Sequence, residues 1–177
     1  MIRRAAIQDA REIAEIHVQT WRAAYAGLVP ETHLSALSMG KGTARWQDAL
    51  SKSTDGTLAA EVDGRIVGWI SFGKSRDDDG RMAGEVYAVY VRPVFWGKGF
   101  GRKLMESAEA HLWAHGHERI TLWVLEGNQR SRVFYSRAGY ALDGTRKPLS
   151  IGGKPLWELR YVKIAEHACR GHTFACR

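Results

Sequence analysis

The sequence predicts a single layered domain of mixed helices and strands, an α/β or α+β fold. Two observations carry this prediction. Segments with a helical spacing of apolar residues alternate with short segments rich in Val, Ile and Tyr, in the order ααβββαβαβ. The length of 177 residues also fits one domain, and 45% apolar residues suffice for a core without disulfides.

Two helices are expected before the first strand. The first covers residues 9–24, where apolar residues recur near helical spacing and acidic residues occupy the expected first turn. The second helix is weaker. It runs through residues 33–50, and the glycines Gly40 and Gly42 are expected to interrupt it.

Three strands follow, and the first two form a hairpin. Residues 57–62 and 65–72 are rich in β-favouring residues, and the Asp-Gly pair between them is typical of a tight hairpin turn. Residues 85–92 alternate around Val and Tyr as a strand does. The acidic run in residues 76–81 lacks the alternating spacing of a calcium loop, so we expect a polar turn and no metal site.

The second half of the chain alternates between helix and strand. Helical spacing is clearest in residues 101–115, where a Leu or Ala returns every four positions. A strand, a helix and a last strand are then expected at residues 119–125, 128–138 and 157–162. Residues 1–163 are expected to form the domain. Residues 164–177, which include Cys169 and Cys176, are expected to form an unstructured tail with reduced thiols.

The chain has 26 Lys and Arg against 19 Asp and Glu, a charge of +7 that points to an anionic partner. Nucleic acid, an acidic membrane surface and a phosphate-bearing cofactor all fit this charge, so charge alone does not choose between them. No apolar run approaches the roughly 20 residues of a membrane helix, and the first residues lack the apolar stretch of a signal peptide. We therefore expect a cytoplasmic protein.

The most informative segment is residues 89–104, in which three alternating glycines connect a strand to a helix. Glycine lets the backbone turn tightly and approach a ligand, and N–H groups at the start of a helix attract anions. Three cations stand beside the glycines: Lys98, Arg102 and Lys103. The pattern predicts a pyrophosphate site at Gly97, Gly99 and Gly101.

Two nucleotide-binding motifs fit this loop only in part. The phosphate loop of nucleotide hydrolases needs Ser or Thr after its Lys, but Gly99 follows Lys98 here. A dinucleotide fingerprint needs a third glycine where this chain has Arg102, whose side chain would obstruct the packing of helix on strand. Both interpretations are weakened and stay open.

The same loop resembles that of a known family. Residues 96–101 resemble the acetyl-coenzyme A loop of the GNAT family of N-acetyltransferases, Gln/Arg-x-x-Gly-x-Gly/Ala, except that Trp96 replaces the usual Gln or Arg. Residues 122–140 resemble the family's fifth strand and fourth helix, with the ending Tyr-x-x-x-Gly-Tyr. The order of elements is similar over residues 1–163. The resemblance implies a central mixed, mostly antiparallel sheet flanked by helices.

The resemblance also implies which residues bind acetyl-coenzyme A, the expected co-substrate. The pantetheine and acetyl group are expected against the backbone of Val89, Tyr90 and Val91. The pyrophosphate is expected on the loop residues Gly97, Lys98, Gly99, Phe100, Gly101 and Arg102. Asn128 is expected against the co-substrate from the next helix.

Acetyl transfer to an amine requires loss of an amine proton and protonation of the departing thiolate. Tyr135 shares a helical face with Asn128, seven residues earlier, and the resemblance assigns its phenol the role of general acid. A core aromatic residue is the alternative. Glu85 opens the strand that leads to the loop, where members of the family often carry a Glu that acts as the base. The alternative is an exposed strand-end charge, with water as the base.

The acceptor is expected near the end of the first helix. In the family the first two helices and their loop line the acceptor site, which makes Trp21, Arg22 and Tyr25 candidate contacts. The same residues could instead pack the loop onto the sheet. The sequence does not distinguish a polyamine, an aminoglycoside, an amino acid or a protein amine.

The sequence therefore predicts an N-acetyltransferase that moves an acetyl group from acetyl-coenzyme A to a primary amine of a small molecule or peptide. No Cys in the body of the chain can act as a nucleophile, so direct attack by the amine is expected. We expect a monomer or homodimer that binds neither nucleic acid nor a membrane. Two alternatives stay open: a non-catalytic acyl-coenzyme A sensing module and a dinucleotide-dependent oxidoreductase.

Overall fold

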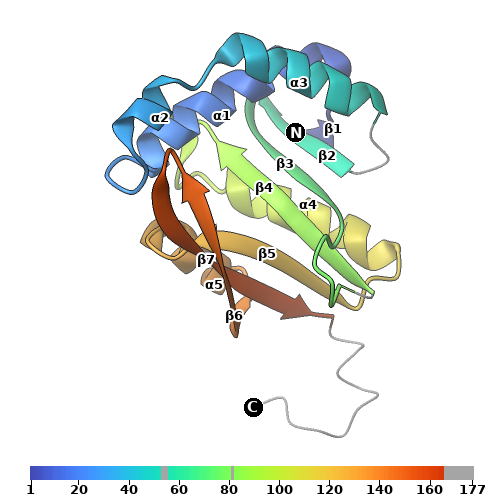
Figure 1. Cartoon of the computed structure of the whole chain (residues 1–177). Helices are drawn as coiled ribbons and strands as arrows, with labels where there is room; N and C mark the ends of the chain where they lie inside the picture. The colour runs from blue at the N-terminus through green and yellow to red at the C-terminus, as the bar shows by residue number, and fades with distance from the viewer. Residues whose placement is uncertain (53–55, 81, 166–177) are drawn as a thin grey trace, which may run out of the picture.

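The computed structural model describes residues 1–52, 56–80 and 82–165 (Figure 1). The strands are β1 (Ile2–Arg4), β2 (Gly56–Val62), β3 (Arg65–Lys74), β4 (Ala83–Val91), β5 (Arg119–Leu125), β6 (Ala141–Ile151) and β7 (Lys154–Ile164). The helices are α1 (Ala10–Ala24), α2 (Glu31–Ser35), α3 (Met39–Lys52), α4 (Phe100–Ala114) and α5 (Gln129–Arg137). The tail expected from residue 164 falls mainly on residues 166–177, which lie outside the described part.

The strands form one sheet in the order β1-β2-β3-β4-β5-β7-β6. β4 and β5 are parallel, and all other neighbouring pairs are antiparallel. Helices α1 to α3 lie on one side of this sheet and α4 and α5 on the other (Figure 1). The expected fold class, a mixed and mostly antiparallel sheet flanked by helices, is therefore confirmed.

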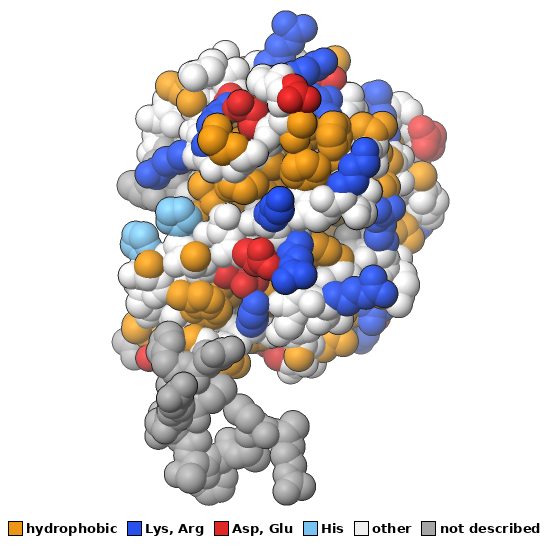
Figure 2. Space-filling model, turned by 180° about the vertical axis from the view of Figure 1, so that it is seen from behind, with side chains coloured by type: hydrophobic (Ala, Val, Ile, Leu, Met, Phe, Trp, Pro, Cys, Tyr) orange, Lys and Arg blue, Asp and Glu red, His pale blue; other side chains and the backbone are white. Residues whose placement is uncertain are grey.

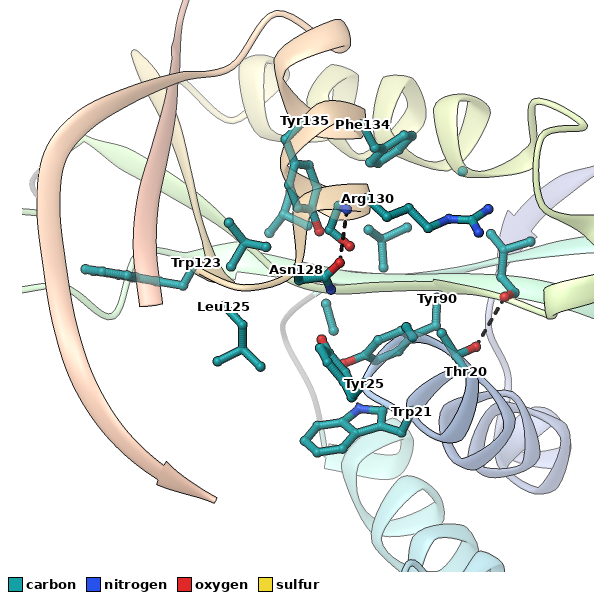
Figure 3. A pocket seen from close by; sticks show the side chains of 18 of the residues that line it. Thr20, Trp21, Tyr25, Tyr90, Trp123, Leu125, Asn128, Arg130, Phe134 and Tyr135 are labelled. Carbon is teal, nitrogen blue, oxygen red and sulfur yellow. Dashed lines mark hydrogen bonds between the residues drawn. The ribbon is translucent and has the colours of Figure 1, made fainter. Parts of the chain in front are cut away.

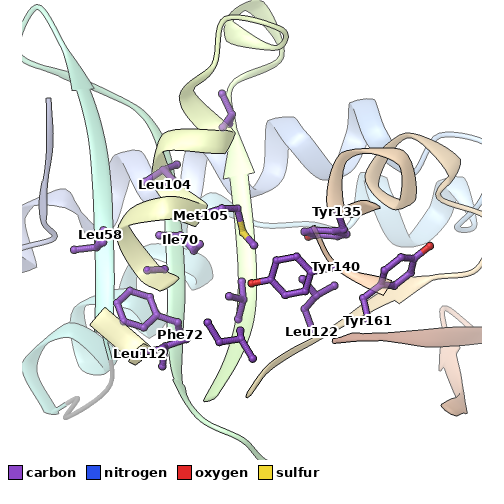
Figure 4. Packing of buried hydrophobic residues seen from close by; sticks show 14 of the residues in the cluster. Leu58, Ile70, Phe72, Leu104, Met105, Leu112, Leu122, Tyr135, Tyr140 and Tyr161 are labelled. Carbon is purple, nitrogen blue, oxygen red and sulfur yellow. The ribbon is translucent and has the colours of Figure 1, made fainter. Parts of the chain in front are cut away.

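Helix α4 packs its apolar face on the sheet. Leu104, Ala108 and Leu112, the residues that repeat every four positions, are all at most 3% exposed. They contact strand residues such as Ile70 and Phe72, and the cluster continues to the tyrosines of α5 and β7 (Figure 4). The helical spacing read from the sequence is thus the face that the sheet buries.

A second, smaller core lies on the opposite face of the sheet. Ile13 and Ile16 of α1 pack on Trp69 of β3, which is 1% exposed. The Trp69 indole Nε1 donates to the Ile13 carbonyl at 3.1 Å, so its polar group is satisfied inside this core. Trp46 of α3 meets the Trp69 ring edge-on, with 4.6 Å between centroids. These contacts fix α1 and α3 over β3 and β4.

The interruption expected inside the second helix lies elsewhere. The helical conformation is interrupted between Ser35, where α2 ends, and Met39, where α3 begins. Gly40 and Gly42 belong to the first turn of α3. A Cβ at Gly42 would lie 3.1 Å from the Ala14 Cβ of α1. The glycine therefore allows two helices to approach closely and does not end one. No described helix is long and apolar enough to cross a bilayer.

Two strands were not expected from the sequence. β1 has only three residues, and residues 141–146 of β6 are all exposed at the edge of the sheet, so neither strand has a long alternation of buried and exposed residues. The hairpin expected between β2 and β3 is confirmed, with positive φ at Asp63 (49°) and Gly64 (73°).

The polar turn between β3 and β4 is held by an arginine from β7. The Arg160 guanidinium, 8% exposed, pairs with Asp79 at 2.7 Å and with Asp77 at 3.2 Å. It also pairs with Asp143 of β6 at 2.7 Å. The acidic residues of the turn thus connect the middle of the sheet to its β6–β7 edge.

Candidate active site

β4 and β5 are held together only where they begin. Their parallel pairing joins residues 83–86 to residues 119–122, whereas β4 continues to Val91 and β5 to Leu125. Beyond the pairing the two strands spread apart (Figure 1). The gap holds a cavity of about 680 Å³, here called the central cavity, which is lined by residues 86–91 and 123–125 of the two strands. Ligands of sheets with parallel neighbours bind at such carboxyl ends.

A β-bulge directs the end of β4 away from β5. Ser71 of β3 lies opposite Ala88 and Phe72 lies opposite Val86, so Tyr87 is an extra residue in β4. Such a bulge bends the strand and increases its twist. One edge of residues 88–91 stays paired with β3, and the other edge faces the central cavity without a strand partner. Val89, Tyr90 and Val91, the expected co-substrate contacts, all line the cavity.

The glycine loop closes one end of the central cavity. Gly97 and Gly99 have φ of 74° and 85°, a region that favours glycine, and Gly99 is the N-cap of α4. Of the expected pyrophosphate contacts, five line the cavity: Gly97, Gly99, Phe100, Gly101 and Arg102. Lys98 does not line it: its ammonium lies 5.0 Å from the centroid of the Phe95 ring. Backbone N–H groups at the start of a helix attract anions, so this end of the cavity suits an anionic group.

Trp96, which stands where a Gln or Arg was expected, ties the loop to the strand. Its Nε1 donates to the Val91 carbonyl at 2.7 Å. The Arg130 guanidinium of α5 lies 3.8 Å from the centroid of the indole ring, a cation–π contact. Arg130 also lines the central cavity and adds a positive charge beside the loop.

Helix α5 provides the second wall, with Asn128 and Tyr135 side by side (Figure 3). The Asn128 side chain caps the helix by accepting from the Ser131 N–H at 3.1 Å. Tyr135 is 9% exposed, and no described residue forms a hydrogen bond with its hydroxyl. Burial raises the pKa of Tyr135, so the phenol keeps its proton at neutral pH. The structure thus brings together the amide and phenol that the spacing placed on one helical face.

Aromatic side chains from α1 and β4 form the opposite wall. Trp21, Tyr25 and Tyr90 lie together across the cavity from Tyr135 (Figure 3). The Trp21 Nε1 donates to the Tyr90 hydroxyl at 2.9 Å, and the Tyr25 ring meets Trp21 edge-on at 4.8 Å. Burial raises the pKa of both Tyr25 and Tyr90, so these phenols are neutral hydrogen-bonding groups.

Arg22, the third expected acceptor contact, does not line the central cavity. Its guanidinium donates to the carbonyl of Leu34 at 3.3 Å and to that of Leu37 at 3.4 Å. Arg22 therefore holds α2 and the following turn against α1. Its neighbours Trp21 and Tyr25 are the residues of this segment that reach the cavity.

Glu85 lies beneath an arginine and outside the central cavity. Its side chain is 1% exposed and pairs with the Arg76 guanidinium, whose Nε lies 3.2 Å from both carboxylate oxygens. The Arg76 N–H also donates to Glu85 at 2.9 Å. Charge-assisted bonds of this kind are short and strong, so they hold the carboxylate in place against Arg76. The base role expected for Glu85 stays a prediction.

One carboxylate that the sequence analysis missed faces the cavity. Glu158 of β7 lines it, and loss of solvation raises the pKa of this carboxyl. Lys147 Nζ is 3.7 Å away, a weaker pairing than that of Glu85. In the sheet Glu158 lies opposite Leu125, the last residue of β5. Its sequence neighbours form an ordinary alternating strand, and only the pairing of β7 with β5 places this carboxylate at the gap.

The comparisons with known proteins agree with this geometry. The model of the Acetyltransferase (GNAT) family matches residues 10–140. The uncharacterised N-acetyltransferase YuaI of Bacillus subtilis is 32% identical over 135 residues, which cover 76% of this chain and 76% of YuaI. The PaiA N-acetyltransferase of Thermoplasma acidophilum, solved with coenzyme A, is 21% identical with a TM-score of 0.74, over 93% of this chain and 98% of that one. YncA of Salmonella typhimurium, solved with acetyl-coenzyme A, is 23% identical with a TM-score of 0.71, over 99% and 98%.

Proposed function

The chain belongs to the acetyltransferase (GNAT) family, and from that premise we propose that it transfers the acetyl group of acetyl-coenzyme A to a primary amine. One observation carries the proposal most strongly. The gap between β4 and β5 has a glycine loop and a helix start at one end, where N–H groups attract anions, and the Tyr135 phenol on its wall. Family membership displaces the dinucleotide-dependent oxidoreductase as an alternative.

In this proposal the co-substrate lies along β4. The pyrophosphate binds the N–H groups of the loop and the start of α4, with Arg102 and Arg130 supplying charge. The pantetheine and the acetyl group lie against the free edge of Val89, Tyr90 and Val91. PaiA and YncA were solved with coenzyme A and acetyl-coenzyme A, which supports this assignment.

The chemical step is direct attack. The amine nitrogen forms a bond to the thioester carbonyl carbon, the carbon–sulfur bond breaks, and the thiolate leaves. Tyr135 faces the cavity with a hydroxyl that no described residue binds, and it donates a hydrogen bond to the thiolate as its charge develops. Its raised pKa makes Tyr135 a weaker acid than free tyrosine, so this stabilisation contributes more than complete proton transfer.

The amine must lose a proton before or during attack. We assign its uptake to Glu158, directly or through water, because this carboxylate lines the cavity and its pKa is raised toward neutrality. In the same proposal Glu85 is not the base. It holds the Arg76 side chain in position. The proposed setting is the cytoplasm. The chain is proposed to act as a monomer or homodimer, and sedimentation velocity measures this oligomeric state directly.

Two measurements test the proposal. Acetyl-coenzyme A at 100 times its Kd should stabilise the fold by about 2.7 kcal/mol, and a nicotinamide dinucleotide should not. A panel of amines should then release free thiol from acetyl-coenzyme A. Binding without thiol release by any class of amine would leave the sensing module as the function. Failure to bind acetyl-coenzyme A would refute both.

A further inference from the structure

A second cavity lies on the other side of β4, beneath α1 and α3. It has a volume of about 520 Å³ and is floored by β2, β3 and β4. We call it the basic cavity, because its charged lining residues are Lys41, Arg45 and Arg76. No Asp or Glu is among the described residues that line it. The basic cavity therefore has a positive charge that its own walls do not neutralise.

Two of these cations are available to a ligand. Arg76 is paired with Glu85. Lys41 and Arg45, by contrast, form no ion pair with any described residue. They are four residues apart on α3, a spacing that places both on the same helical face. The helix thus presents an ammonium and a guanidinium together at the rim of the cavity.

The remaining walls are aromatic. Trp46, Trp69, Tyr87 and Tyr90 line the basic cavity, with the His17 ring stacked 6.4 Å from the Trp69 ring. Burial, with a smaller effect of Arg45, lowers the pKa of His17 to about 4, so the imidazole is neutral at physiological pH. The cavity thus combines an apolar body with cationic groups at its edge, which suits a ligand with an apolar frame and an anionic group.

The basic cavity and the central cavity are neighbours that share lining residues of β4. Tyr87, Ala88 and Tyr90 line both. The central cavity is lined by the Glu158 carboxylate as well as by Arg102 and Arg130 beside its glycine loop. The basic cavity has Lys41 and Arg45, and no carboxylate of the described residues lines it. A molecule that reaches across β4 could place an ammonium group near Glu158 and an anionic group near Lys41 and Arg45, so its charges would match both cavities.

We propose that the basic cavity binds an anionic group, a carboxylate or a phosphate, of the acceptor amine, and that the enzyme acts on amines carrying such a group. The proposal rests on the proposed acetyltransferase function. Arg45 and Lys41 hold the anion, the aromatic walls hold the apolar frame, and the amine reaches the gap between β4 and β5. The acceptor class is therefore amino acids and amino phosphates, not polyamines.

Direct binding tests the site without turnover. We expect benzoate or phenyl phosphate to bind in calorimetry, while the neutral benzamide binds at least about tenfold more weakly. Arg45→Glu should abolish the preference for the anions. The control Arg11→Glu makes the same charge change at an exposed α1 residue outside both cavities. The stronger of the two anions identifies the group. Equal binding of benzoate, phenyl phosphate and benzamide would overturn the proposal.

Turnover separates this inference from the proposed function. Amino carboxylates of increasing length, from 4-aminobutyrate to 6-aminohexanoate, are compared with butylamine to hexylamine by thiol release. We expect kcat/KM to favour a carboxylate by about tenfold or more at one length, and Arg45→Glu to remove the advantage. Transfer to alkylamines and amino carboxylates at equal rates would overturn the anion site while the acetyltransferase stands. Anion binding that Arg45→Glu removes, without transfer to any amine, would refute the acetyltransferase and keep the anion site.

Discussion

The two halves of the site are built in different ways. The proposed co-substrate half is made of backbone: the free edge of β4 and a glycine loop with φ of 74° and 85° at Gly97 and Gly99. The proposed acceptor half is made of side chains: Trp21 of α1, Tyr25 directly after that helix, and Glu158 of β7. A backbone site needs one short continuous segment, whereas a side-chain site can draw on distant ones. The first half is therefore expected to fail through single glycine changes, and the second to change specificity gradually.

The Lys and Arg side chains of the chain also fall into two groups, those that hold the fold together and those that line the cavities. On the face shown in Figure 2, Lys and Arg side chains are spread among acidic and apolar ones, without forming one continuous basic surface there. Several cations have structural tasks: Arg160 joins the acidic turn to β7, and Arg22 holds α2. Arg102 and Arg130 line the central cavity, and Lys41 and Arg45 line the basic one.

The largest effect is expected at the backbone half. Gly99→Val puts a β-branched residue at a φ of 85° and turns N–H groups away from the phosphate. Two lost charge-assisted hydrogen bonds, at about 1.5–3 kcal/mol each, should raise the Kd for coenzyme A by about 100-fold or more. Calorimetry measures this change.

A matched control separates strain from binding. Gly116 has a φ of 79°, and a Cβ added there or at Gly99 would meet nothing within 4 Å. Gly116→Val should therefore lower stability by a similar amount and leave coenzyme A affinity unchanged. Equal affinities for the two variants would mean that the loop does not bind the pyrophosphate.

A smaller loss is expected when Tyr135→Phe removes the hydroxyl and keeps the ring. Turnover should fall by about 100-fold, the low end of the range for acid–base groups, because a thiolate is a tolerable leaving anion. The Kd for acetyl-coenzyme A should change little. Tyr140→Phe, in the same core cluster but outside the cavity, is the control. Normal turnover at saturation would reduce Tyr135 to packing.

A smaller effect on kcat/KM is expected from the two carboxylates, Glu158 and Glu85, and only Glu158→Gln should change the pH profile. Glu158→Gln should lower kcat/KM by about tenfold and weaken the acid limb of its pH profile, because only the ionised carboxylate accepts a proton. Glu85→Gln should leave the profile's shape unchanged and lower stability, since Arg76 loses an ionised partner. A profile altered by Glu85→Gln alone would make Glu85 the base after all.

The smallest effect concerns the aromatic cluster around His17. Its pKa is about 4 in the folded protein against about 6.5 unfolded, so the unfolded chain binds the proton first as the pH falls. Stability should therefore be lost between about pH 6.5 and pH 4, by about 1–2 kcal/mol after screening by solvent in the open cavity. Urea unfolding across this window measures it. His17→Gln should remove that part of the loss; an unchanged loss would exclude His17.

Parts of the fold were predictable because their signals are local. Leu104, Ala108 and Leu112 repeat at the helical period, and a two-residue turn at Asp63 and Gly64 needs positive φ. The break of the second helix was misplaced because Gly42 serves a contact with Ala14, 28 residues away in the chain. β6 was missed since an exposed edge strand has no buried face to give it a period.

The sequence by itself predicted the co-substrate half of the proposed site. Three glycines, a helix start and a phenol seven residues after an asparagine are local features, and their geometry follows from backbone sterics and helical spacing. Only the tertiary structure decided the acceptor half. The divergence of β4 from β5 opens the cavity, the pairing of β7 with β5 brings Glu158 to it, and the packing of α3 on α1 sets Lys41 and Arg45 over β4. Such side chains come together through long-range pairing, which no short stretch of sequence encodes.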